Sequence, residues 1–198
     1  MNFLDAGSGD PVVLLHGGFL DHRMWAAQIP VLAAGHRVIA PDARGHGRSA
    51  NATGPFRHTD DLAGLLRDLA LGPVVLIGVS MGAATAVDTA LEHPSLVRAL
   101  VITGAGTSEP YFTDPWTVQA LGTWTAAMAA GDLAGSLDGF LQFVAGPHRT
   151  LAEGDPQVVA DLRAMATATM SKHEKGEPDW LRSVTSTWDR LPSIGVPV

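Results

Sequence analysis

One stretch decides the fold: Val74-Val75-Leu76-Ile77-Gly78-Val79-Ser80-Met81-Gly82-Ala83-Ala84. An apolar, β-branched run leads into a turn in which Gly78 and Gly82 flank Ser80 at two positions on either side, and small helix-forming residues follow. Glycine has no Cβ, so this spacing lets the chain turn sharply from a strand into a helix. The strand-turn-helix context is typical of a turn that presents a nucleophilic serine.

Ser80 is therefore the first candidate catalytic residue. The start of a helix offers free N–H groups and the positive end of the helix dipole, which favour developing negative charge. We expect a positive φ at Ser80, because the sharp turn strains its backbone. The alternative interpretation is an ordinary structural turn, since Gly-x-Ser-x-Gly also recurs by chance, but the flanking strand and helix patterns favour the nucleophile.

Outward from this stretch, apolar runs alternate with helical patterns. Leucines at positions 62, 65, 66 and 69 fall on one helix face behind Thr59, a predicted N-cap, and another helix is predicted over residues 22–34. The alternation predicts an α/β fold with a mostly parallel sheet and flanking helices. The adjacent parallel strands are expected at residues 12–16, 37–40, 74–78 and 99–103, with residues 2–5 as a further short strand.

After Gly106 the pattern changes. Residues 110–190 show no convincing strand and are rich in Ala, Met and Trp, which predicts a helical insertion. Asp155-Pro156 is typical of a helix start, and four apolar residues are predicted to share a later helical face: Trp180, Leu181, Val184 and Trp188. The expected organisation is a core over 1–109, the insertion over 110–190, and a linker with the start of another core strand over 191–198.

Composition excludes several classes of protein. The formal charge of −7 without a basic stripe argues against nucleic-acid binding, and no apolar run is long enough to span a membrane. The chain of 198 residues has no Cys, which fits a cytoplasmic protein and removes thiolate catalysis. Zinc-binding spacing is absent, and Gly104-Ala105-Gly106 does not match a dinucleotide-binding motif, so we expect no metal and no cofactor.

Three motifs follow one another along the chain, each after a predicted strand: His16-Gly17-Gly18, then Arg44-Gly45-His46-Gly47-Arg48-Ser49, then the turn around Ser80. Together they resemble the α/β-hydrolase fold family over residues 2–106, with a helical cap more loosely matched by the insertion. The resemblance implies an oxyanion hole made by the amides of Met81 and Gly18, with Phe19 as the adjacent alternative. It also implies a cap over the active site, in which some tryptophans line an apolar acyl pocket: Trp116, Trp124, Trp180 and Trp188.

The rest of the family's triad is an acid and then a histidine, both after the cap. The resemblance therefore places them beyond residue 198, and we expect little enzyme-like activity from the 198-residue chain by itself. We also expect an unpaired sheet edge at residues 99–103, through which the chain could self-associate. Glu109 and Asp114 remain alternative acids.

The other titratable candidates have structural interpretations. His16 is expected to orient its loop, His46 to shape its turn, and Asp42 to pair with Arg44. His93 suits a helix C-terminus, and the remaining candidates, His148 and His173, are expected to be exposed to solvent.

These observations predict a cofactor-independent serine hydrolase that acts on a small ester or lactone. Ser rather than Asp at position 80 argues against the dehalogenase and epoxide-hydrolase branches, which the motifs also resemble. Enzymes of the same family that catalyse acyl transfer, perhydrolysis or carbon–carbon bond hydrolysis share these N-terminal motifs, so these three reactions remain alternatives. The alternative from another class is a non-catalytic binding or interaction protein on the same fold.

Overall fold

The computed structural model describes residues 1–104, 106–174 and 176–198, so Ala105 of the Gly104-Ala105-Gly106 segment lies outside the described residues. The chain divides into two compact units, and each is described by itself. The first comprises Met1–Pro110 and Pro178–Val198, and the second comprises Tyr111–Glu177. Among the described residues, none of the helices combines the length and the apolar character needed to cross a bilayer.

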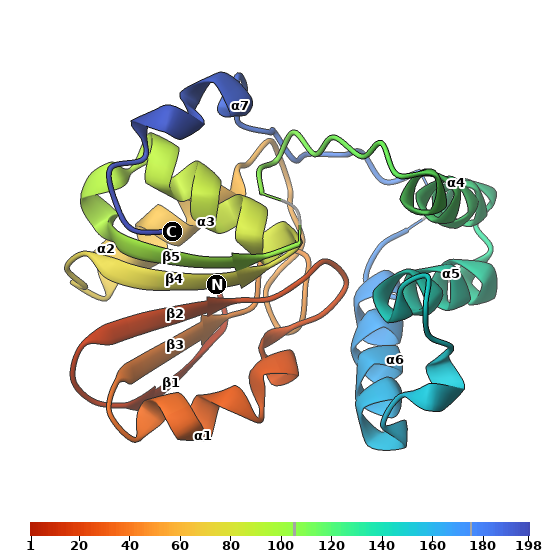
Figure 1. The fold of residues 1–198 in the computed structure, drawn as a ribbon, viewed down its shortest axis with the longest axis horizontal. Coiled ribbons are helices and arrows are strands. Elements are labelled where there is room, and N and C mark those ends of the chain that lie inside the picture. Colours follow the sequence, from red (N-terminus) through yellow and green to blue (C-terminus); the bar gives the residue numbers. More distant parts are fainter. Residues whose placement is uncertain (105, 175) are drawn as a thin grey trace. The chain divides into compact units, whose positions relative to one another are not determined.

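The described part of the first unit is built on a five-stranded sheet with the order β1-β3-β2-β4-β5 (Figure 1). The strands are β1 (Phe3–Gly7), β2 (Pro11–Leu15), β3 (Arg37–Pro41), β4 (Val74–Val79) and β5 (Val97–Thr103). β1 is antiparallel to β3, and the other neighbours are parallel. The prediction of four adjacent parallel strands is confirmed, and the predicted short strand near the N-terminus forms an antiparallel edge.

Both faces of β2 are buried. On β2, Val13 and Leu15 pack in a cluster with leucines of α2 (His58–Asp68) and small residues of α3 (Met81–Glu92). The alternate residues, Val12 and Leu14, pack on the opposite face with Trp25. Period-2 alternation of a wholly apolar strand therefore supplies two cores, one on each side.

Two of the helices differ from prediction, one by being divided and the other by where it begins. The helix predicted over 22–34 is divided into η1 (His22–Trp25) and α1 (Gln28–Ala33). Pro30 explains the break, because its ring has no N–H and clashes with the carbonyl four residues earlier. Thr59 is not the N-cap of α2, since the helix already begins at His58 and Arg57 holds the cap position in an extended conformation.

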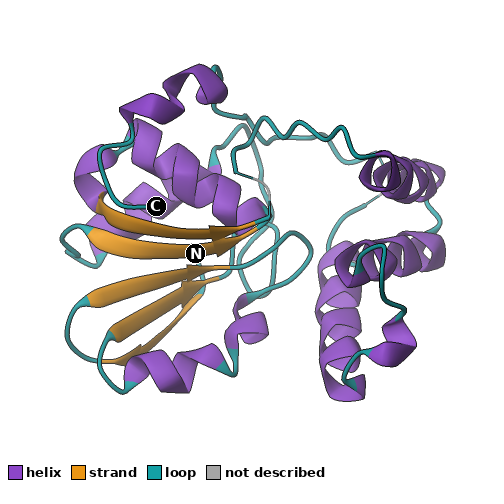
Figure 2. Cartoon of the chain, viewed as in Figure 1, coloured by secondary structure: helices purple, strands orange, loops and turns teal. Residues whose placement is uncertain are grey.

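The second unit is helical throughout its described ordered elements (Figure 2). It contains α4 (Pro115–Ala130), α5 (Leu133–Ala145), η3 (Leu151–Glu153) and α6 (Pro156–Met170). The predicted start at Asp155-Pro156 is confirmed, because the Asp155 carboxylate accepts the N–H groups of Gln157 and Val158. Asp114-Pro115 begins α4 in the same way.

The segment that returns to the first unit corrects one prediction. Trp180, Leu181, Val184 and Trp188 do not share a helical face, because the helix there is only α7 (Thr187–Arg190), followed by η4 (Leu191–Ser193). The Phe56 N–H donates to the Trp180 carbonyl at 3.0 Å, and the Arg182 N–H donates to the Phe56 carbonyl at 2.8 Å. These backbone groups are thus engaged by a distant strand-like segment and cannot form a helical ladder.

Residues 194–198 lie beside the outer strand of the sheet. The Leu100 N–H of β5 donates to the Pro197 carbonyl at 2.9 Å, and Ile194 and Val196 pack against the core. Val101 on the same strand keeps 53% of its surface exposed. Self-association through this edge stays a prediction.

Asp88 of α3 is a buried carboxyl group with an unusual environment. Its exposed fraction is 2%, one oxygen has no hydrogen-bond partner, and the other accepts the Ser108 N–H at 3.2 Å. Burial raises the pKa of Asp88, and the nearby Glu109 and Glu92 raise it further, although the bond from Ser108 opposes them. The folded chain therefore binds a proton on Asp88 more tightly than the unfolded chain does.

We expect the Asp88→Asn substitution to stabilise the fold at neutral and alkaline pH. A raised folded pKa means that stability is lost as pH rises from the unfolded pKa to the folded one, and an amide avoids this loss. The gain should be on the order of 1–3 kcal/mol at pH 8 and should vanish near pH 4. Thermal melts across this range measure it, with exposed Asp68→Asn as the control. A gain that did not depend on pH would contradict the assignment.

Candidate active site

Ser80 stands at the junction of β4 and α3, at the carboxyl end of β4. Its backbone angles are φ 51° and ψ −113°, so the prediction of a positive φ is confirmed. The Ser80 N–H donates to the Thr103 carbonyl of β5 at 2.9 Å, and the Ser80 carbonyl accepts the Ala84 N–H at 2.9 Å. The strained residue is thus held from both sides, as a functional constraint requires.

The two flanking glycines are required by close backbone contacts. A Cβ on Gly78 would overlap the carbonyl group of Gly82, and a Cβ on Gly82 would overlap the backbone of Leu15. Ala83 is fully buried against the sheet. The placement of glycine two residues before and two residues after Ser80 therefore follows from these backbone contacts, which leave no space for a Cβ.

His16 orients the loop that follows β2. Its ring is buried; Nδ1 lies 2.8 Å from the Gly17 carbonyl, and Nε2 accepts the Ala43 N–H at 2.9 Å. This pattern assigns the proton to Nδ1 of a neutral ring, which agrees with burial lowering the pKa of His16. Both nitrogens are occupied, so His16 has no free acceptor with which to act as a base toward Ser80.

The predicted oxyanion donors come from two neighbouring strand ends. Met81 is the first residue of α3, where N–H groups have no acceptor within the helix. Gly18 and Phe19 form the corner of a turn closed by the Leu20 N–H on the Gly17 carbonyl at 3.2 Å. Phe19 has φ 61°, an uncommon value for a residue with a side chain, which marks this corner as strained. Their role as oxyanion donors stays a prediction.

Asp42 does not pair with Arg44, so that prediction is wrong. Its fully buried carboxylate accepts four hydrogen bonds, from Asn2 Nδ2 at 2.8 Å, the His22 N–H at 2.9 Å, His22 Nδ1 at 2.7 Å and the Arg48 N–H at 2.9 Å. Although burial by itself raises the pKa of Asp42, these bonds outweigh it and lower the pKa. Asp42 thus ties together three segments near the site.

Arg44 pairs instead with Asp61 of α2. Two bonds of 2.8 and 2.6 Å join the guanidinium to the carboxylate, and the cation lies 5.2 Å from the centre of the Phe56 ring. The bond to Asp61 raises the pKa of Arg44. Asp61 lies in the first turn of α2, and nothing in the local sequence pattern links it to a loop in front of the helix.

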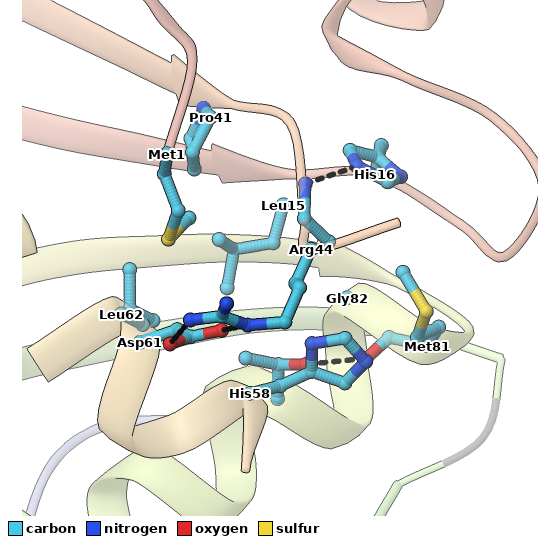
Figure 3. A pocket seen from close by; sticks show the side chains of 12 residues that line it. Met1, Leu15, His16, Pro41, Arg44, His58, Asp61, Leu62, Met81 and Gly82 are labelled. Atoms are coloured by element: carbon cyan, nitrogen blue, oxygen red, sulfur yellow. Dashed lines mark hydrogen bonds and ion pairs between the residues drawn. The ribbon is translucent and has the colours of Figure 1, made fainter. Parts of the chain in front are cut away.

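A pocket lies between the starts of α2 and α3 and adjoins the turn at Ser80 (Figure 3). Its described lining includes Met81 and Gly82 from the turn, but Ser80 is not among the lining residues. His58 and the Arg44–Asp61 pair lie on its wall (Figure 3). Burial lowers the pKa of His58 to about 4, so the ring is neutral at physiological pH. Sequence reasoning missed His58, because it is the first residue of a regular helix and belongs to no motif.

The remaining candidate histidines have structural partners or lie in the second unit. His46 Nδ1 lies 3.0 Å from the Arg44 carbonyl, and His93 Nε2 lies 3.3 Å from Asp60. His148 is exposed, and His173 bonds Glu177 at 2.9 Å within the second unit. The expectations for His46 and His93 agree with these positions.

The two alternative acids are already engaged. The Glu109 carboxylate accepts the Thr187 hydroxyl and N–H, each at 2.7 Å, and these bonds lower its pKa. The Asp114 carboxylate caps α4 through the Trp116 and Thr117 N–H groups. Both carboxylates thus have structural roles in the described chain.

The four predicted acyl-pocket tryptophans fall in different units. Trp116 and Trp124 lie on α4 and pack against α5, with Trp124 5.4 Å from the Phe140 ring centre and Trp116 6.1 Å from that of Phe143. Trp180 and Trp188 belong to the first unit, and Trp188 Nε1 donates to the Glu109 carbonyl at 2.7 Å. Their contact with a substrate stays a prediction.

Among the described residues, one group of side chains could hold a metal ion: Asp21, His22 and Asp42. Their ligand atoms lie within 4.8 Å of one another. Asp21, however, is already bonded to Arg23 at 2.7 and 2.8 Å, and Asp42 accepts the four bonds given above. The donor set therefore fits an internal ion-pair cluster better than a metal site.

Comparison with known proteins agrees with this geometry. The model of the alpha/beta hydrolase fold matches residues 10–189. The chain is 37% identical over 112 residues to the 2-hydroxy-6-oxo-6-(2'-aminophenyl)hexa-2,4-dienoic acid hydrolase of Metapseudomonas resinovorans, a match that covers 52% of this chain and 38% of that protein. It is 38% identical over 131 residues to the pimeloyl-[acyl-carrier protein] methyl ester esterase of Aromatoleum aromaticum, covering 65% of this chain and 49% of that one.

A solved structure extends the likeness over the whole chain. A thermophilic esterase from Thermogutta terrifontis superposes with a TM-score of 0.71 at 27% identity, covering 99% of this chain and 72% of that one. The matches to the two curated relatives each span less than half of the relative's length.

Proposed function

This chain belongs to the alpha/beta hydrolase fold family, and we propose that it is the part of a serine hydrolase that carries the nucleophile, Ser80, for the cleavage of carboxylic esters or lactones. The observation that supports this most is the strained φ of 51° at Ser80, at the first turn of α3. Such strain persists where function requires it. A carboxylate nucleophile, as in other branches of this family, has no counterpart at this turn.

In the proposed reaction, Ser80 Oγ bonds to the carbonyl carbon and its proton passes to a general base. The carbonyl oxygen becomes an oxyanion, which the Met81 N–H and the N–H of Gly18 or Phe19 stabilise; each such donor is worth about 2.7–4 kcal/mol of barrier. The alcohol leaves with a proton, and water then releases the acid from Ser80. Both ring nitrogens of His16 already have hydrogen-bond partners, so we assign the role of general base to a histidine other than His16.

A second candidate is the hydrolysis of a carbon–carbon bond, which the same serine could perform. The relative from Metapseudomonas resinovorans is named for a dienoic acid that has no ester bond, and it shares 37% identity. The two candidates differ in the bond broken and agree on Ser80, Met81 and the turn at Gly18.

The test is to label the protein, expressed together with the segment that supplies its general base, with a fluorophosphonate, which reacts covalently with activated serines, and to locate the adduct by mass spectrometry. We expect the adduct on Ser80 alone. Turnover of p-nitrophenyl butyrate and of a 2-hydroxy-6-oxo-dienoic acid then distinguishes ester from carbon–carbon hydrolysis. An unlabelled Ser80 together with no turnover of either compound would favour a non-catalytic binding protein.

A further inference from the structure

Gly104, directly after β5, lies against the backbone of Ser80. Its φ is +84°, and a Cβ built on it would lie 3.3 Å from Ser80 N and 3.4 Å from Ser80 Cα. Those distances are tighter than nine in ten real Cβ contacts, so a side chain at position 104 would press on the backbone of Ser80. No motif around Ser80 includes this glycine.

The preceding residue explains why Gly104 stands there. Val79 and Thr103 are paired in the parallel ladder, and the Ser80 N–H continues this ladder by donating to the Thr103 carbonyl at 2.9 Å. The chain must then leave the ladder beside a residue that is itself in a strained conformation. A left-handed glycine makes that departure possible without pushing on Ser80.

We propose that Gly104 is a positioning residue for the nucleophile: together with the Thr103 carbonyl it fixes the backbone of Ser80, and so the direction of Oγ. This inference rests on the proposed function, because it assigns a second residue to the reaction of Ser80. A side chain at position 104 would move the Ser80 backbone by a few tenths of an ångström. Misplacement of a reacting atom by about 1 Å can cost 10²-fold in rate.

The chain offers a matched control at Gly9, in the turn between β1 and β2. Gly9 also has a positive φ, +103°, and a Cβ there would lie 3.3 Å from the Gly35 carbonyl oxygen. Gly9 precedes β2 and so lies at the opposite end of the strands from Ser80. Gly9→Ala thus imposes similar backbone strain and a similar close contact away from the nucleophile. Gly106→Ala is a second control, because a Cβ there meets nothing within 4 Å.

The experiment compares Gly104→Ala, Gly9→Ala and Gly106→Ala with the unmodified protein. We expect Gly104→Ala and Gly9→Ala to lower Tm by a similar amount, roughly 2–4 °C. Only Gly104→Ala should slow fluorophosphonate labelling of Ser80 and lower kcat for p-nitrophenyl butyrate, by about twofold to tenfold, with KM nearly unchanged. Gly106→Ala should leave Tm, the rate of labelling and kcat unchanged.

The outcomes separate the two proposals. If the unmodified protein is neither labelled nor active, the proposed function fails. If it is labelled but Gly104→Ala reacts as fast as Gly9→Ala, the function stands and the positioning role of Gly104 is refuted. An equal loss of rate in Gly104→Ala and Gly9→Ala would also refute it, because general destabilisation would then explain the effect.

Discussion

In the protein with its general base present, replacing Ser80 with alanine is expected to lower ester hydrolysis by at least about 10⁴-fold, because loss of the nucleophile leaves only the oxyanion donors and substrate binding. The change removes one oxygen and keeps the Cβ, so the turn should still form. We therefore expect Tm to change little. Initial rates with p-nitrophenyl butyrate measure the effect, and the exposed Ser95→Ala serves as the control.

A second substitution at the same position separates function from strain. Ser80 has φ 51°, a conformation that glycine adopts readily and other residues do not. Ser80→Gly should be as inactive as Ser80→Ala but more stable, by about 1 kcal/mol, which corresponds to roughly 2–4 °C in Tm. If Ser80→Ala kept most of the activity, Ser80 could not be the nucleophile. If Ser80→Gly were no more stable than Ser80→Ala, the turn would not be strained at this residue.

The turn around Ser80 could be predicted from sequence because its requirements are local. Gly78 and Gly82 are needed where two backbones meet, and the residues on either side have clear strand and helix patterns. The set of adjacent parallel strands followed from the same alternation. In each case the deciding contacts lie within one strand-turn-helix unit, so short-range spacing contains the information.

The wrong predictions concern residues whose hydrogen-bond partners lie far away in the sequence. Asp42 and Arg44 are two residues apart, yet the chain directs them to different partners, His22 and Asp61. Trp180, Leu181 and Trp188 matched a helical period, but Phe56 binds the backbone on either side of Leu181. Pairings of this kind depend on how loops pack in space, and no local pattern records them.

Gly104 shows a related limit. Its sequence context suggested only a glycine-rich end of a strand, and its importance lies in contact with a residue on the neighbouring strand. His58 is similar, because its neutral state depends on burial beside Arg44 and Met81 in the pocket of Figure 3. The sequence thus located the candidate nucleophile, whereas the residues around its turn became visible only in three dimensions.

Asp42→Ala is expected to cause the largest loss of stability, about 3–5 kcal/mol, because it leaves four donors around a fully buried site without their acceptor. Urea unfolding followed by circular dichroism measures the loss. Asp5→Ala is the matched control, because the Asp5 side chain is 36% exposed and pairs with Arg37 in solvent. Removing such a surface pair should cost less than about 1 kcal/mol.

The pH dependence gives this prediction a second test. The folded pKa of Asp42 is lowered, because the hydrogen bonds to its carboxylate outweigh the opposing effect of burial. Its contribution is therefore fully present above the unfolded pKa and is lost as pH falls through the folded pKa. The difference in unfolding free energy between the unmodified protein and Asp42→Ala should thus be constant from pH 6 to 8 and shrink in acid. A loss no greater than that of Asp5→Ala, or one that grew in acid, would show that Asp42 does not hold the loops beside Ser80 as an ionised carboxylate.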